Sequence, residues 1–206
     1  VAVIGAGIAG TTTAYALLKK GHKVTILDSR RYPAMATSYA NGGQLSASNA
    51  ETWNTTKNVI DGFKWMFTPD APLLFNPSPE IQKYKWMFGF LLATLKSEHK
   101  KNTLETIDLA KKAREIYFKI ADEEGIEFEL LKKGILRFYD SEKEFKLDKN
   151  KASWLDQDGM EWDILTREEV VNLEPAFRNN KNLDKILGGI YTKSDASGDI
   201  HKFCTN

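Results

Sequence analysis

The sequence predicts an α/β protein that opens with a Rossmann-like strand–helix–strand unit and continues into α+β material. Two short apolar runs, Val1–Ile4 and Val24–Leu27, indicate strands. Between them, residues 9–20 carry apolar side chains at helical spacing and stop before Gly21. Strand, glycine turn, helix and strand in this order make a βαβ unit, whose two strands we expect to be parallel.

The segment after this unit changes character. Residues 29–56 are rich in Ser, Ala, Asn, Thr and Gly and show little periodicity. A loop of this length inside a compact protein is usually functional or disordered. Two aromatic-rich helical segments follow, Val59–Phe67 and Ile81–Leu95, separated by a stretch that contains several prolines.

The remaining elements are indicated by capping boxes and short apolar runs. Asn102 and Glu105 form a capping box that should open a helix running to about Glu124. Two further boxes, at 141–144 and 166–169, should start helices, the second ending before Pro175.

Three strand-like runs accompany these helices. Glu127–Leu131 and Ile135–Tyr139 suit an antiparallel hairpin, and Ile186–Thr192 is predicted to be a strand. We therefore assign residues 1–56 to the first part of a cofactor-binding domain. Residues 57–192 form a helical insertion and a portion of an α+β substrate domain, and 193–206 begin the return to the first domain. We expect an incomplete chain, because a strand starts at Val1 and a helix capped by Asp199 has scarcely begun at the end.

Composition excludes several classes of protein. Apolar residues make up 42% of the chain, enough for a packed core. Lys and Arg number 29 against 28 Asp and Glu, so no overall field attracts nucleic acid. No metal site is expected, because Cys204 is the only cysteine and the three histidines lie far apart. The longest apolar run, residues 86–95, is too short to cross a bilayer, which needs about 20 residues.

The glycine motif carries the chemistry. A G-x-G-x-x-G pattern lies between the first strand and the helix and comprises Gly5, Ala6, Gly7, Ile8, Ala9 and Gly10. Its glycines permit the tight turn, the approach of a pyrophosphate to the backbone, and close packing of the helix on the strands. The helix N-terminus offers unpaired N–H groups to the phosphates. The motif therefore predicts a dinucleotide site.

Asp28 ends the second strand, eighteen residues after Gly10, where a carboxylate can accept hydrogen bonds from ribose hydroxyls. It would repel a 2′-phosphate, which disfavours NADP. A nicotinamide domain normally continues with another strand and helix, whereas this chain enters a loop that could place N–H groups and small polar side chains against a flavin ring. FAD is therefore favoured over NAD, with a plain surface loop as the alternative.

Beyond these features, the chain resembles the FAD-dependent D-amino acid oxidase superfamily, and within it the small-subunit type of bacterial D-amino acid dehydrogenase. The residues that carry the resemblance are Val3–Gly10, Thr37–Gln44, Lys64–Phe67 with Ala71–Leu73, Lys85–Met87, Leu173–Ala176, Gly188–Ile190 and Gly198–Asp199. The glycine motif is common to many flavoproteins, whereas its combination with the two Lys-Trp-Met segments is more specific.

The resemblance implies oxidative deamination of a D-amino acid to a 2-oxo acid and ammonia, with electrons passed to a membrane acceptor such as a quinone. It implies a cytoplasmic protein, with peripheral contact at the inner face of the bacterial inner membrane as a further hypothesis. It implies no catalytic residue here, because the groups that clamp the substrate carboxylate lie mainly in the second half of family members. The cofactor-binding residues that we expect from the motif and the resemblance are Ile4, Gly5, Ala6, Gly7, Ile8, Ala9, Gly10, Asp28, Ser29, Thr37, Ser38, Asn41, Gly42, Gly43 and Gln44.

Two rival functions remain open from the sequence. A glycine or sarcosine type FAD amine oxidase would use oxygen and other amines. A non-catalytic NAD-binding module would use the same glycine turn without redox chemistry.

Overall fold

The structure is a computed structural model and describes residues 1–68, 70–71, 75–96, 98–155 and 161–206. The chain divides into two compact units, one made of Val1–Ser46 with Lys112–Asn206 and the other of Ala47–Lys111. The assignment of residues 1–56, 57–192 and 193–206 to cofactor and substrate domains stays a prediction.

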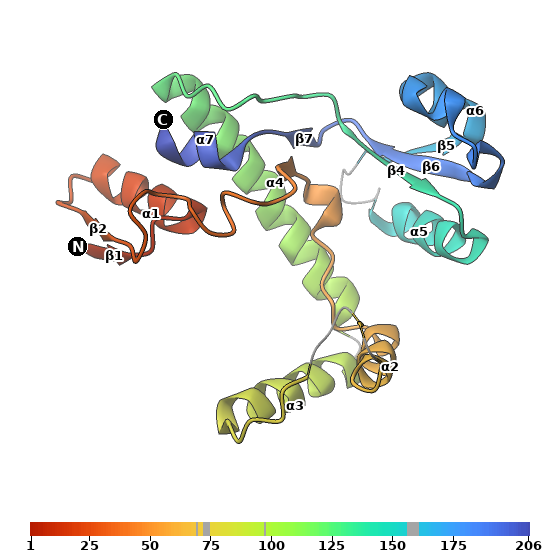
Figure 1. The fold of residues 1–206 in the computed structure, drawn as a ribbon, viewed down its shortest axis with the longest axis horizontal. Helices are drawn as coiled ribbons and strands as arrows, with labels where there is room; N and C mark the ends of the chain where they lie inside the picture. The colour runs from red at the N-terminus through yellow and green to blue at the C-terminus, as the bar shows by residue number, and fades with distance from the viewer. Residues whose placement is uncertain (69, 72–74, 97, 156–160) are drawn as a thin grey trace. The chain divides into compact units, whose positions relative to one another are not determined.

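The first unit opens with the predicted βαβ arrangement. Strand β1 (Ala2–Ile4) and strand β2 (Thr25–Leu27) are parallel, with Ala2 opposite Thr25, and helix α1 (Ile8–Lys19) connects them (Figure 1). After the cap at Lys20, Gly21 adopts a φ of +81°, a conformation that glycine accepts without strain. The βαβ prediction is confirmed.

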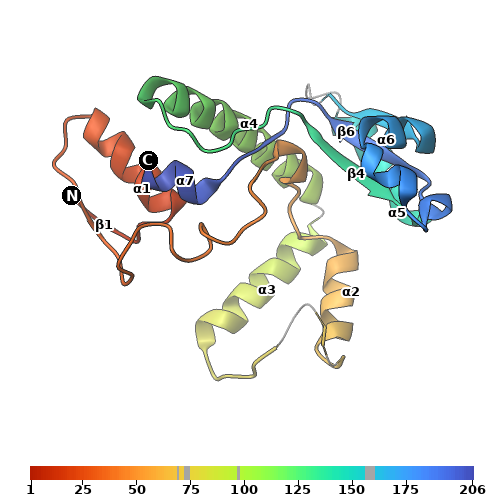
Figure 2. The same ribbon diagram turned by 45° about the horizontal axis from the view of Figure 1, so that its top comes forward.

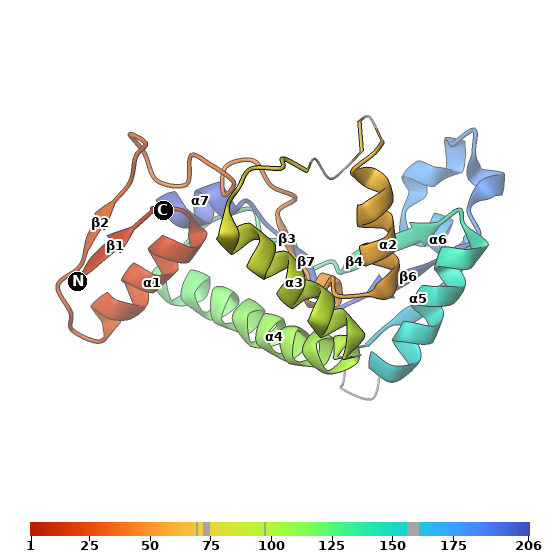
Figure 3. The same ribbon diagram turned by 90° about the horizontal axis from the view of Figure 1, so that it is seen from below.

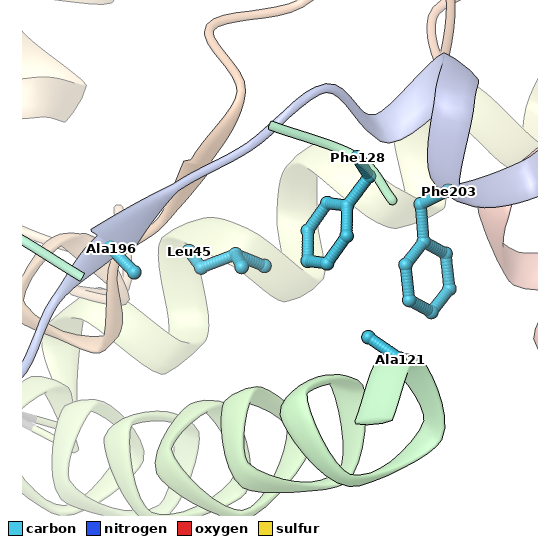
Figure 4. Close-up of a cluster of buried hydrophobic side chains, with 5 residues drawn as sticks. All are labelled: Leu45, Ala121, Phe128, Ala196 and Phe203. Carbon is cyan, nitrogen blue, oxygen red and sulfur yellow. The ribbon is translucent and has the colours of Figure 1, made fainter. Parts of the chain in front are cut away.

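The core of this unit gathers segments from both ends of the chain. Strand β3 (Gln44–Leu45) pairs antiparallel with β7 (Ala196–Ser197), which leads into α7 (Ile200–Thr205). The rings of Phe128 and Phe203 meet edge to face at 5.1 Å. Figure 4 shows these rings with the other buried members of the cluster, Leu45, Ala121 and Ala196. The return of 193–206 toward the N-terminal segment therefore rests on apolar packing.

A three-stranded antiparallel sheet of order β4-β6-β5 completes the first unit (Figure 2). It comprises β4 (Ile135–Tyr139), β5 (Asp163–Thr166) and β6 (Gly188–Thr192), and it is accompanied by α5 (Glu142–Leu155), α6 (Arg167–Leu173) and two short 3₁₀ turns, η3 (Pro175–Asn179) and η4 (Leu183–Lys185). In its centre Ile190 is fully buried and packs with Tyr139 and Phe145.

The predicted hairpin between residues 127–131 and 135–139 is wrong. Strand β4 pairs with β6 instead, with Ile135 opposite Thr192. Of the first segment only Leu131 makes a β-bridge, to Ser197. Phe128 explains the difference, because its side chain is 2% exposed and anchors this segment in the core below β7. Burial of a large aromatic side chain outweighs a local turn signal.

The capping boxes have different outcomes. The hydroxyl of Thr166 accepts from the N–H of Glu169, whose carboxylate accepts from the N–H of Thr166, so this box is confirmed. At Ser141 only the bond from the N–H of Glu144, at 3.4 Å, is present. The box at Asn102 is wrong, because α4 (His99–Glu124) begins earlier and the N–H of Asn102 donates to the carbonyl of Glu98, the residue before the helix, at 2.9 Å.

The second unit contains the 3₁₀ turn η1 (Ala47–Asn49), α2 (Thr56–Trp65), α3 (Ile81–Leu95) and the first part of α4 (Figure 3). Helix α2 starts three residues before the predicted Val59, because the side chain of Thr55 caps it by accepting from the N–H of Asn58. The hydroxyl of Thr103, which is fully buried, pairs with that of Thr52 at 3.1 Å. None of the helices in the described ranges combines the length and the apolar character needed to cross a membrane.

Candidate dinucleotide site

The turn between β1 and α1 is built by the glycines of the motif. Gly5 takes a φ of +97° and donates its N–H to the carbonyl of Leu27 at 2.7 Å, which ties the turn to β2. A Cβ on Gly10 would lie 1.8 Å from the carbonyl oxygen of Gly5, so no side chain fits there. A Cβ on Gly7 would lie 3.2 Å from the hydroxyl of Ser38. The turn and the helix therefore pack as the motif predicts.

The N-terminus of α1 presents backbone donors. The first helical bond runs from the N–H of Thr11 to the carbonyl of Gly7 at 2.9 Å. The N–H of Ile8 donates to the hydroxyl of Ser38 at 3.0 Å. Within the described part of the chain, nothing accepts from the N–H groups of Ala9 and Gly10. An anion at this helix end would meet free donors and the positive end of the helix dipole.

Asp28 stands beside this turn. One of its carboxylate oxygens accepts from the N–H of Ala6 at 2.6 Å and the other from the N–H of Arg30 at 2.7 Å. These bonds, first that from Ala6, hold the pKa of Asp28 below its usual value, so the group is ionised at neutral pH. Each oxygen keeps a further lone pair, and both Asp28 and the adjacent Ser29 are exposed. A sugar hydroxyl could donate to such a carboxylate.

The loop that follows is held together by Asn41. Its side-chain nitrogen donates to the carbonyls of Thr37 and Ser38 at 3.1 and 2.9 Å, and its oxygen accepts from the N–H of Gly43 at 2.7 Å. Gly43 has a φ of +59°, and a Cβ there would lie 2.6 Å from the carbonyl of Gly198. The carbonyl of Gly43 in turn accepts from the N–H of Gly198 at 2.8 Å. The loop is thus an ordered, hydrogen-bonded segment that packs against the residue following β7.

A pocket of about 380 Å³ opens beside this loop. Its lining comprises Tyr39, Asn41, Gly42, Gly43, Glu129, Leu131, Ser197, Gly198, Asp199 and Ile200. A larger hollow of about 570 Å³ is lined by α4 and the 126–132 segment, with Lys202, and includes no residue of the glycine turn or the loop. We regard the smaller pocket as the one relevant to cofactor binding, because predicted cofactor residues line it.

The sequence-predicted residues thus fall into two groups. Ile4 through Gly10, Asp28 and Ser38 meet around the N-terminus of α1. Thr37, Asn41, Gly42, Gly43 and Gln44 lie along the loop that reaches β7. The bond between Ser38 and Ile8 joins the two groups.

Sequence reasoning missed two residues of this site. Ala34 has a φ of +56°, is buried, and donates its N–H to the carbonyl of Ala6 at 2.8 Å. No pattern in the sequence signals it. Gly198 was noted only for family resemblance, although a glycine before the cap residue Asp199 could have suggested close backbone contact.

Comparison with known protein families gives one match over the whole chain. The family model described as DAO, FAD dependent oxidoreductase, matches residues 1–206. D-amino acid dehydrogenase 3 of Mesorhizobium japonicum is 48% identical over 204 residues, which is 99% of this chain and 48% of that protein. D-amino acid dehydrogenase of Dechloromonas aromatica is 34% identical over 98% of this chain and 48% of its own length. The chain thus spans about half the length of the curated relatives it matches.

Solved structures show the same fold at low identity. Glycine oxidase from Bacillus cereus superposes with a TM-score of 0.62 at 20% identity and covers 98% of this chain and 40% of its own. L-proline dehydrogenase from P. horikoshii gives a TM-score of 0.64 at 17% identity, covering 99% of this chain and 39% of its own. At such identities the likeness concerns the fold alone.

Proposed function

Because the chain belongs to the family of FAD dependent oxidoreductases (DAO), we propose that the intact protein oxidises D-amino acids to 2-oxo acids and ammonia with FAD as its cofactor. The observation that carries the substrate class is the 48% identity with D-amino acid dehydrogenase 3 over 99% of this chain. The glycine or sarcosine alternative has weaker support, because glycine oxidase shares the fold at 20% identity. The family assignment agrees with the prediction of FAD rather than NAD and removes the case for a non-catalytic NAD-binding module.

The geometry of the glycine turn fits the diphosphate of FAD. The absence of a side chain at Gly7 lets a phosphate approach the backbone, and the N–H groups of Ala9 and Gly10 have no acceptor among the described residues. Asp28 is ionised and retains acceptor capacity for the ribose hydroxyls of the adenosine. We assign these residues to the adenosine diphosphate half of the cofactor.

The loop 37–44 is assigned to the flavin half. Its carbonyls and N–H groups are fixed by Asn41 and by the pairing of Gly43 with Gly198. Because their positions are set before binding, polar groups beside the pocket can hold a planar ring at low entropic cost. This arrangement supports the assignment of Thr37, Ser38, Asn41, Gly42, Gly43 and Gln44 as cofactor-binding residues.

When bound, FAD supplies the acceptor for the hydride that leaves the α-carbon of the amino acid, and the resulting imine is hydrolysed by water to the 2-oxo acid and ammonia. The residues of this chain bind and orient the cofactor. Ser38 links the helix N-terminus to the loop and so couples the positions of the two cofactor halves. No residue of this chain is assigned a role at the α-carbon.

The proposal extends to a membrane electron acceptor such as a quinone. It places the protein in the cytoplasm, peripherally at the inner face of the bacterial inner membrane. Support comes from the relatives, which are named as dehydrogenases rather than oxidases. The same protein should reduce a quinone analogue faster than it reduces oxygen.

The test uses the intact natural protein. We expect a flavin absorption spectrum that D-alanine bleaches under anaerobic conditions, whereas L-alanine and sarcosine leave it unchanged. Bleaching by sarcosine or glycine but not by D-alanine would replace the proposal by an amine oxidase of the glycine type. A colourless protein that does not take up added FAD would refute it.

A further inference from the structure

The backbone of Ala34 accepts a hydrogen bond from a side chain that lies far from it in the sequence. The ring nitrogen Nδ1 of His201, in α7, is 3.3 Å from the carbonyl oxygen of Ala34. Because a carbonyl oxygen can only accept, Nδ1 carries the proton and donates. Both residues belong to the first unit, in which α7 lies beside α1 (Figures 1 and 2).

The conformation of Ala34 explains why this bond matters. Its φ of +56° lies in the left-handed region, which alanine adopts only where its surroundings hold it there. The residue is 2% exposed, and its N–H donates to the carbonyl of Ala6 at 2.8 Å. Two hydrogen bonds, one through its N–H and one through its carbonyl, therefore hold Ala34 in a conformation that is unfavourable by itself.

The partner of Ala34, Ala6, is the middle residue of the glycine turn and is held from two sides. Its N–H donates to the carboxylate of Asp28 at 2.6 Å, and its carbonyl accepts from the N–H of Ala34. A chain of hydrogen bonds thus runs from His201 through Ala34 to the turn that is proposed to receive the diphosphate. Ala34 also lies between Asp28 and the loop 37–44 in the sequence, so its conformation sets the path of the chain between them.

The imidazole ring of His201 is held beside this carbonyl by its neighbours. The rings of His201 and Tyr39 meet edge to face, with their centroids 5.0 Å apart. The hydroxyl of Thr205 donates to the carbonyl of His201 at 3.0 Å. Phe203, which is 5% exposed, anchors α7 in the core. A ring that is already fixed loses little conformational freedom when its hydrogen bond forms.

We propose that His201 is a positioning residue for the FAD site, which holds the glycine turn in its binding conformation through Ala34. The inference rests on the function proposed above, in which this turn binds FAD. The role requires no contact between the imidazole and the cofactor, because the bond acts through the backbone of Ala34 and Ala6. The coupling is reciprocal, so FAD bound at the turn should in turn stabilise the docking of α7.

The experiment is FAD titration of the intact natural protein after its cofactor has been removed by mild dialysis. His201→Leu removes the donor and should raise the dissociation constant of FAD about tenfold, the effect of one lost hydrogen bond. His201→Asn places an amide nitrogen where Nδ1 lies and should keep the dissociation constant within about threefold of the wild type. Equal affinity of the wild type and His201→Leu would overturn the inference, and so would equal losses in the two variants.

A control variant and a check of folding separate positioning from stability. His22→Leu changes an exposed histidine that follows α1 and should leave the dissociation constant unchanged. Each variant is titrated at a temperature at which circular dichroism shows its cofactor-free form to be folded. Under this condition a lower stability of the fold alone does not alter the affinity for FAD.

A second variant tests whether the histidine acts through Ala34. Glycine adopts a positive φ without strain, so Ala34→Gly should make the turn depend less on the bond from His201. In the Ala34→Gly background, His201→Leu should therefore raise the dissociation constant of FAD by less than about threefold. A loss as large as in the wild-type background would show that the histidine does not act through Ala34 and would overturn the inference.

Hydrogen exchange measures the reciprocal effect without any turnover. Added FAD should slow the exchange of amides in α7 of the wild type, and clearly less so in His201→Leu. Slowing of equal size in both proteins would contradict the coupling. Bleaching by D-alanine is measured on the same preparation. A wild type that binds no FAD would refute the proposed function and this inference with it, whereas equal FAD affinities of the wild type and His201→Leu refute the inference alone.

Discussion

At Gly10 the space available for a side chain decides whether the turn can form. A Cβ there would lie 1.8 Å from the carbonyl oxygen of Gly5, which is backbone and cannot rotate aside. We expect Gly10→Ala to push α1 away from the turn, to lower the free energy of unfolding by about 1–3 kcal/mol, and to weaken FAD binding. Urea unfolding and FAD titration of the intact protein measure both effects.

Gly89 provides the matched control, because it also lies within a helix and an added Cβ would have no neighbour within 4 Å. Gly89→Ala should raise the free energy of unfolding by about 0.5–1 kcal/mol through helix propensity and leave FAD affinity unchanged. A Gly10→Ala protein that is as stable as the wild type would contradict the packing of the turn.

The ionisation of Asp28 makes the free energy of unfolding depend on pH. The N–H groups of Ala6 and Arg30 depress its pKa in the folded state, so its ionised form stabilises the fold. This contribution is complete above the unfolded pKa of about 3.9 and is lost as the pH falls through the lower folded pKa. The difference in unfolding free energy between wild type and Asp28→Asn should therefore be constant near neutrality and shrink below about pH 4. Urea unfolding across an acidic pH series checks this, and a difference that grows in acid would oppose it.

At this scale the sequence predicts which residues form the turn better than it predicts their contacts with the loop. The glycine spacing and the acid after β2 were enough to place the turn and Asp28 together. The hydrogen bond from Ile8 to Ser38 spans thirty residues of chain, and the conformation of Ala34 has no signal of its own. Such contacts depend on how a long loop closes, which local propensities do not determine.

At the scale of elements, a buried ion pair holds three segments together. Arg114 in α4 donates to the carboxylate of Asp195 at 2.7 Å, and the hydroxyl of Ser46, just after β3, donates to the same carboxylate at 2.8 Å. The side chain of Asp195 is fully buried and that of Arg114 is 9% exposed. The group therefore fixes the end of β3 between α4 and the start of β7.

Breaking this pair leaves one charge buried without its partner. Asp195→Ala should lower the free energy of unfolding by about 3–5 kcal/mol, and Arg114→Met by a similar amount. The double variant should cost clearly less than the sum of the two, because neither charge then remains. A double-mutant cycle by urea unfolding measures the coupling. Additive losses would mean that the two side chains act independently.

The pairing of strands is where prediction from the sequence fails. Helix α3 and the βαβ unit follow from periodicity and were predicted closely. Strand β4 was expected beside its neighbour in sequence, yet its partner β6 lies some fifty residues further along. The sequence pattern identifies a strand by its side chains but not the neighbouring strand to which it bonds. Here the burial of Phe128 in the core excludes the expected pairing of β4 with residues 127–131.

At the scale of the whole molecule, the proposed cofactor site joins segments from both ends of the chain. The glycine turn, the loop 37–44 and the return segment around Gly198 meet only when the first unit is folded. A ligand that binds this assembled site and not the unfolded chain must stabilise the fold, by an amount that rises with its free concentration.

The intact protein, freed of cofactor by mild dialysis, should therefore unfold at a higher urea concentration as FAD is added. Once FAD exceeds its dissociation constant, each tenfold rise in free FAD should add about 1.4 kcal/mol to the free energy of unfolding. NAD should have a much smaller effect, because it lacks the flavin that the loop 37–44 is proposed to hold. Gly10→Ala should shift the FAD curve to higher concentrations, whereas Gly89→Ala should not. If NAD and FAD stabilised the protein equally, the contacts would be confined to the adenosine diphosphate half that both share, and the assignment of the loop to the flavin would be wrong.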